Sequence, residues 1–161
     1  MTRNKILIYL NGQDQRILSP NSNIIILAKE KLENIKQDHT LLQIDLASLE
    51  DFIKAEAFIK SQHTTIDELI IINKNIDLNM ISYQYDFNHV KQTYQVLTNI
   101  IYFINLLIPL FNNNIQFTLS FEKKNHYKVH FNNFKMALLN YLETLKIDLI
   151  KSNNIIIKKL D

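Results

Sequence analysis

The sequence predicts an α/β protein built on a doubly wound parallel sheet, and three observations support this prediction. Runs rich in isoleucine and leucine recur along the 161-residue chain, and they are continuous rather than alternating, as in strands buried on both faces. Segments with helical spacing of apolar residues separate the later runs. Right-handed crossovers between such strands favour the sheet order 3-2-1-4-5-6 in a single domain spanning residues 1–161.

The first half of the chain contains three expected strands and little helix. A polar stretch after the turn dipeptide Asn11-Gly12 is too short for a complete helix, so we expect a shortened first helix and a thin flank there. The expected strands are bounded by turn residues and are rich in β-branched residues. These elements are strands at Lys5–Leu10, Asn23–Leu27 and Leu41–Ile44, with a short helix or turn at Glu30–Gln37.

The second half alternates helices and strands. Ser48 is placed to cap an amphipathic helix, and Pro109 stands where the longest periodic segment ends. An irregular connection is expected over Asp77–Asn88. The remaining elements are helices at Leu49–Ser61, His89–Phe111 and residues 131–150, and strands at Ile66–Ile72, Ile115–Leu119 and Asn154–Lys158.

Composition excludes several classes of function. The net charge of +2 comes from interspersed acids and bases, so a nucleic-acid or anionic-lipid surface is not indicated. The absence of cysteine excludes disulfides, thiolate metal ligands and a cysteine nucleophile. The N-terminal apolar run is too short for a signal peptide, and the apolar segment Val96–Phe111 is shorter than the roughly 20 residues of a membrane span. We therefore expect a cytoplasmic protein that does not enter a membrane.

Glycine is the most informative residue count, because Gly12 is the only one in the chain. Loops that hold phosphates need glycines where the backbone turns at positive φ and approaches the ligand closely. One glycine allows neither a dinucleotide fingerprint nor a P-loop. Glu122, His126 and His130 recur at four-residue spacing, but they precede the last long helix in a polar loop, so we expect no metal site.

The segment Ile115–Leu149 carries a resemblance to a known family. It is predicted to form a strand, a loop and a helix, and Phe131-Asn132-Asn133-Phe134-Lys135 stands at the start of that helix. This arrangement resembles the short-chain dehydrogenase/reductase family, in which a Tyr-x-x-x-Lys motif follows a strand ending in a catalytic serine. The resemblance implies a Rossmann-like fold and NAD(P)-dependent oxidoreductase ancestry, with phenylalanine in place of the tyrosine.

The resemblance implies that the family's catalytic positions are not intact. In the family the tyrosine delivers a proton, the lysine lowers its pKa, the serine binds the carbonyl and an asparagine completes a relay. Phe131 has no hydroxyl, so the same proton transfer cannot occur at that position. The matching positions are Val96 for the asparagine, or Asn99 in a slipped register, Ser120 or Phe121 for the serine, Phe131 for the tyrosine and Lys135 for the lysine.

The cofactor positions implied by the resemblance are remnants, and we expect no bound cofactor. Lys29 matches a basic residue near the ribose, although an exposed lysine at a strand end is usually only solvated. Asp45 matches an aspartate near the adenine, although an aspartate that caps the next helix would look the same. Gly12 and Asn73 are the other two remnants, and the chain ends before the family's substrate-binding lobe.

The main hypothesis is a catalytically inactive relative that acts through association. Family members dimerise through the helices that match residues 89–111 and 131–150, so we expect a homodimer or a heteromer with an active homologue. Two alternatives remain open: an NAD(P)-dependent oxidoreductase that uses a displaced tyrosine such as Tyr127, and an unrelated α/β domain that binds a small ligand. The residues predicted to face outward at the interface are Tyr94, Tyr102, Phe103, Phe134, Tyr141 and Leu145.

Overall fold

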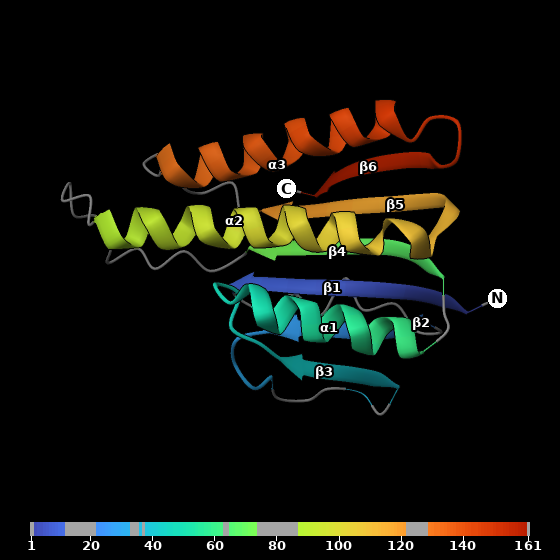
Figure 1. Ribbon diagram of the computed structural model, residues 1–161, viewed down its shortest axis with the longest axis horizontal. Helices are drawn as coiled ribbons and strands as arrows, with labels where there is room; N and C mark the ends of the chain where they lie inside the picture. The colour runs from blue at the N-terminus through green and yellow to red at the C-terminus, as the bar shows by residue number, and fades with distance from the viewer. Residues whose placement is uncertain are drawn as a thin grey trace.

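The protein contains a six-stranded parallel sheet with the predicted order β3-β2-β1-β4-β5-β6. The structure is a computed structural model that describes residues 2–11, 22–32, 36, 38–62, 65–73, 87–121 and 129–160. The strand arrows in Figure 1 all point the same way, so the carboxyl ends of the strands share one edge of the sheet. The strands are β1 (Arg3–Asn11), β2 (Ser22–Ala28), β3 (His39–Gln43), β4 (Ile66–Asn73), β5 (Phe111–Phe121) and β6 (Asn154–Leu160).

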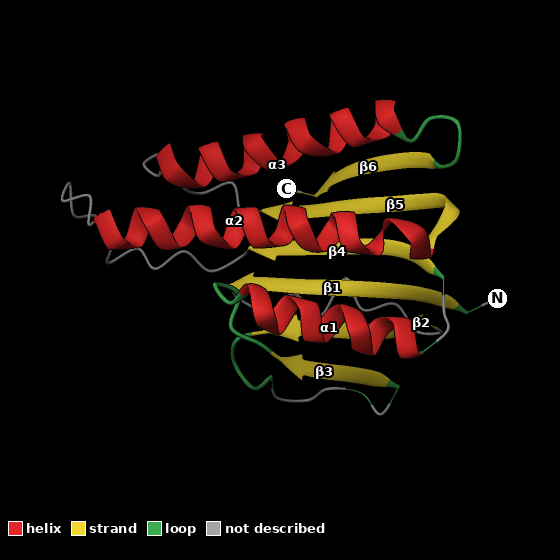
Figure 2. Cartoon of the chain, in the orientation of Figure 1, coloured by secondary structure: helices red, strands yellow, loops and turns green. Residues whose placement is uncertain are grey.

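Three long helices connect the later strands. They are α1 (Leu49–Ser61), α2 (Phe87–Leu107) and α3 (Val129–Asp148), and all three cover the same face of the sheet (Figure 2). One core cluster joins them to the side chains on that face, whereas the buried cluster on the opposite face contains strand residues and Leu32 but no residue of the described helices. The predicted shortened first helix falls at residues 12–21, which lie outside the described residues.

The helix ends follow local signals in the sequence. The Ser48 hydroxyl accepts a hydrogen bond from the backbone N–H of Asp51 at 3.2 Å, and acidic residues occupy the first turn of α1, as the helix dipole favours. α2 ends at Leu107 and is followed by a 3-10 turn, η3 (Ile108–Leu110), that contains Pro109. Residue 111, expected in the helix, is instead the first residue of β5, because the proline cannot continue the helical hydrogen bonding.

The helix α2 is long and apolar enough to cross a membrane by length and composition alone. The qualifying span, Lys91–Leu110, has a mean hydropathy of 1.3 and begins five residues before Val96–Phe111, the segment expected to be too short. The inner side of α2 is part of the core that covers the sheet, with Ile100, Ile104 and Leu107 fully buried. A helix that covers a sheet in this way passes the same test, so the window does not indicate a membrane protein.

Candidate functional site

The candidate site lies at the carboxyl edge of the sheet, where folds of this class bind their ligands. Asn73 ends β4 and pairs in register with Asn11 of β1 and Phe121 of β5. Lys29 follows the end of β2, and Asp45 follows the end of β3. The structure therefore places three predicted cofactor residues, Lys29, Asp45 and Asn73, along one edge of the sheet, while Gly12 lies outside the described residues.

The carboxylate of Asp45 takes part in a local turn. Its Oδ1 accepts a hydrogen bond from the backbone N–H of Ala47 at 3.0 Å, and the Asp45 N–H donates to Oδ2 of Asp51 at 2.9 Å. These bonds organise the turn that leads into α1, whereas the N-cap of α1 is Ser48, so Asp45 does not cap the helix itself. Lys29 is exposed, and its backbone carbonyl accepts a hydrogen bond from the Gln43 side chain at 3.1 Å.

Lys135 is in contact with an aromatic ring. Its ammonium lies over the ring of Phe121, 5.8 Å from the centroid, which is cation–π geometry. Phe121 is buried and also packs against Phe134, with 6.4 Å between the ring centroids. The position beside Lys135 at the end of β5 therefore holds an apolar ring that can neither donate a hydrogen bond nor transfer a proton.

Ser120 points to the other face of the sheet. Successive side chains of a strand alternate between the two faces, so Ser120 and Phe121 cannot both face α3. Ser120 is completely buried, and its hydroxyl has no hydrogen-bond partner within the described part of the chain. The sequence left open which of the two residues takes the serine position, and Phe121 is the one that the structure brings beside Lys135.

Phe131 lies in α3, one turn before Lys135, and its side chain is outside the described residues. Residues 122–128 also lie outside the described part, so Glu122, His126 and Tyr127 cannot be placed in the structure. His130, expected in the loop before the last long helix, instead lies in the first turn of α3, and its side chain is outside the described residues. Within the described residues, no group of three or more histidines or acids is arranged to hold a metal.

The asparagine of α2 has a structural partner. Asn99 is almost fully buried, and its Nδ2 donates to the backbone carbonyl of Leu46 at 3.1 Å, while the Gln95 side chain donates to its Oδ1 at 2.9 Å. Asn99 therefore ties α2 to the turn after β3. Val96, the position matched to the family's asparagine, is half-buried and packs against the core.

A buried polar network on the other face of the sheet was not anticipated from the sequence. The Lys5 ammonium lies 3.0 Å from Oε2 of Glu68, and Thr118 and Gln116 each donate to Oε1 of Glu68 at 2.6 Å. Burial alone would raise the pKa of Glu68, but the hydrogen bond from Thr118 and the ion pair with Lys5 outweigh it and lower that pKa. In-register polar residues on three neighbouring strands were the signal for this network.

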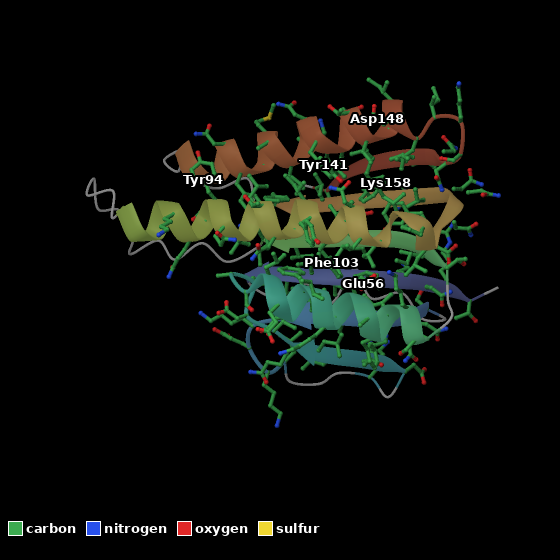
Figure 3. The ribbon with its side chains drawn as sticks, viewed as in Figure 1. Glu56, Tyr94, Phe103, Tyr141, Asp148 and Lys158 are labelled. Carbon is green, nitrogen blue, oxygen red and sulfur yellow. The ribbon has the colours of Figure 1, made fainter. Side chains whose placement is uncertain are left out.

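Three of the predicted interface residues lie in the core instead. Phe103 is fully buried and packs on Phe52 of α1, with 5.1 Å between the ring centroids, and Phe134 and Leu145 are also buried. The prediction that these three face outward was wrong, because α2 packs against α1, α3 and the sheet, and α3 packs against α2 and β6. Figure 3 shows Phe103 between α2 and α1.

The three tyrosines of the predicted interface differ in exposure. Tyr94 and Tyr102 are 46% and 44% exposed, in agreement with an outward position. Tyr141 of α3 is half-buried and packs against the core, and its hydroxyl has no hydrogen-bond partner within the described residues. Burial raises the pKa of Tyr141 to about 12, so this hydroxyl does not titrate near neutral pH.

Comparison with solved structures identifies the fold as that of the short-chain dehydrogenases/reductases. No protein-family model and no curated protein sequence matches the chain. A short-chain dehydrogenase family protein from Francisella tularensis superposes with a TM-score of 0.73 at 16% identity, over 94% of this chain and 66% of that one. L-sorbose reductase from Gluconobacter frateurii, complexed with NADPH and L-sorbose, gives 0.73 at 14% identity, over 96% and 67%.

A third neighbour agrees with these two. Aldohexose dehydrogenase from Thermoplasma acidophilum gives a TM-score of 0.68 at 12% identity, over 98% of this chain and 67% of that one. At these identities the likeness establishes the fold, and activity does not follow from it. The chain spans about two thirds of the length of these neighbours.

Proposed function

We propose that this chain is a catalytically inactive protein with the fold of an oxidoreductase, and that it acts by association with a second copy or with an active homologue. The observation that carries the proposal is the contact of Lys135 with the buried ring of Phe121. In the resembled enzymes the lysine serves a tyrosine hydroxyl and a cofactor ribose. Here the adjacent strand end offers an aromatic ring, and the sequence has Phe131 where the proton donor would stand.

The residues at the carboxyl edge do not fit a dinucleotide. The chain has one glycine, whereas a loop whose backbone closely approaches a pyrophosphate uses several. Asp45 uses a carboxylate oxygen in the turn before α1, and Lys135 is engaged with Phe121. The Ser120 hydroxyl lies on the face of the sheet opposite Lys135, so the two groups do not converge on one reacting atom.

The surface proposed for association is the outer face of α2 together with the neighbouring part of α3. No charged residue occurs between Lys91 and Glu122, so the whole solvent side of α2 beyond Lys91 is uncharged. Depletion of charge and enrichment in tyrosine and methionine distinguish the centre of protein interfaces from ordinary surface. The exposed residues of the outer face of α2 are Tyr94, Gln95, Thr98, Tyr102 and Asn105, and α3 adds the exposed Met136 and Asn140 together with the exposed acid Glu143.

The first test measures binding of the reduced cofactors. We expect no saturable change in NADH or NADPH fluorescence, and no thermal stabilisation, when either cofactor is added to the purified chain at millimolar concentration. An active reductase treated in parallel is the positive control. Saturable micromolar binding accompanied by carbonyl-dependent oxidation would contradict the proposal and support the oxidoreductase alternative.

The second test measures association through the α2 face. We expect Thr98→Lys to weaken association at least about 10-fold in sedimentation experiments, because a lysine would be buried without a partner at the contact. The matched control is Ile53→Lys on α1, a residue that is 44% exposed and lies away from this face. A strict monomer that also retains no reductase from its own cell extract would rule out the association.

A further inference from the structure

The two edges of the sheet differ in how they are protected from pairing with another chain. β6 forms one edge and carries Lys158 and Lys159, both exposed, and lysines are a common device against edge-to-edge association. β3 forms the other edge and has the sequence His-Thr-Leu-Leu-Gln, which contains no acid, lysine or arginine. Of the two described edge strands, β6 is the one that carries charged side chains.

His39 adds no charge to the β3 edge at neutral pH. Burial lowers the pKa of the His39 imidazole below its ordinary value, and the positive charge of nearby Lys36 lowers it further against the opposing effect of Asp38. An imidazole with a lowered pKa is neutral at pH 7. All five residues of β3 are then uncharged, and Leu41 and Leu42 are only half-buried.

The backbone of β3 presents hydrogen-bonding groups away from the sheet. The N–H of Ile44 donates to the carbonyl of Ala28 in β2 at 2.9 Å, and in a parallel ladder alternate residues bond to the same neighbour. Leu42 therefore also bonds toward β2, whereas the N–H and C=O groups of Leu41 and Gln43 point outward. Within the described ranges, no strand lies beyond β3.

A groove runs along this outward edge. It has a volume of about 260 Å³, and its strand side is lined by residues of β3 together with Ile44. Its other wall is one side of α1, which contributes one acidic, one basic and two apolar residues to the groove. These wall residues are Asp51, Lys54, Ala55 and Phe58.

We propose that the β3 edge is a self-association surface, on which the β3 strand of a second copy pairs antiparallel about a two-fold axis at Leu41. In this pairing His39 stands opposite Gln43, Thr40 stands opposite Leu42, and no like charges meet. The two-fold axis also sets the two α1 helices antiparallel on the same face of the joined sheet.

The antiparallel register makes a disulfide test possible, since the chain has no cysteine of its own. Leu41 would lie opposite itself, with Cα atoms about 5.5 Å apart, which is within the range that a disulfide spans. Residue 43 would lie roughly 15 Å from its counterpart, because it stands two positions from the axis on each strand and the strands are about 5.5 Å apart. We expect Leu41→Cys to form a covalent dimer under mild oxidation and Gln43→Cys, the matched control, to stay monomeric on a denaturing gel.

A charge placed on the edge supplies a second readout. We expect Thr40→Lys, added to Leu41→Cys, to lower the disulfide yield at least about 10-fold, whereas Ile156→Lys on the β6 edge leaves it unchanged. Thr98→Lys should also leave it unchanged, which separates this surface from the α2 face. Equal cross-linking at positions 41 and 43, or no cross-linking at position 41 in a chain with native circular dichroism, would overturn the proposal, even if an extended peptide bound the groove.

Discussion

Replacement of Phe103 by alanine is expected to lower the free energy of unfolding by about 3–5 kcal/mol, the cost of removing a fully buried aromatic side chain. The ring of Phe103 fills the space between α2 and α1 and packs on Phe52 at 5.1 Å. No described element moves into the space without disturbing the sheet, so the cavity persists. Urea denaturation followed by circular dichroism measures the loss.

The neighbouring residue provides the matched control. Tyr102 is 44% exposed, so Tyr102→Ala should change stability by no more than about 0.5 kcal/mol. Its expected effect is on association, because it removes an aromatic side chain from the proposed α2 face. If Phe103→Ala unfolds the chain entirely, Phe103→Leu gives a measurable smaller loss. Similar stability of the Phe103→Ala and Tyr102→Ala chains would show that Phe103 is not a core residue.

The contrast between these neighbours shows why the sequence could not decide the orientation of α2. Elements marked by local signals were predicted closely: helix α1 has the expected bounds because Ser48 caps it, and the order of the strands follows from their run lengths and the handedness rule. α2 is apolar around much of its circumference, so periodicity does not select one buried side. Only contacts with α1, α3 and the sheet reveal that Phe103 points inward.

The strand end at Ser120 was predictable in part. Alternation along Phe117–Phe121 places the aromatic residues on one face and Thr118 and Ser120 on the other. Which face carries α3 depends on the crossover, so the sequence left Ser120 and Phe121 as alternatives. The register of β1, β4 and β5 likewise places Lys5, Glu68 and Gln116 side by side. This proximity cannot be seen when each strand of the sequence is considered separately.

The buried ion pair gives the second large expected effect. Lys5→Met should lower the free energy of unfolding by about 3–5 kcal/mol at pH 7, because it removes the cation beside a buried carboxylate. Thr118 and Gln116 still donate hydrogen bonds to Glu68, but they carry no compensating charge. Lys54→Met is the matched control: it breaks an exposed ion pair with Glu50 and should cause no measurable loss.

The double variant Lys5→Met/Glu68→Leu should recover most of the loss, because replacing both members of a buried pair by apolar residues is often close to neutral. Gln116 already donates to the Thr118 hydroxyl at 3.0 Å, so neither side chain is left without a partner. A double variant as unstable as Lys5→Met alone would show that Lys5 stabilises the sheet by packing rather than by charge.

The pH dependence of the Lys5→Met effect tests whether the loss of stability comes from the charge on Glu68. The pKa of Glu68 is lower in the folded chain than in the unfolded chain, so at acidic pH the unfolded chain binds more protons. The contribution of the pair is therefore fully present above the unfolded value of about 4.3 and is lost as the pH falls through the lower folded value. The difference between wild type and Lys5→Met, measured by urea denaturation from neutral to acidic pH, should shrink as the pH falls; it begins to shrink above the unfolded value, because burial without the Lys5 cation favours the protonated carboxyl of Glu68 in the variant. A difference that stays constant or grows over that range would mean that protonation of Glu68 does not relieve the buried charge.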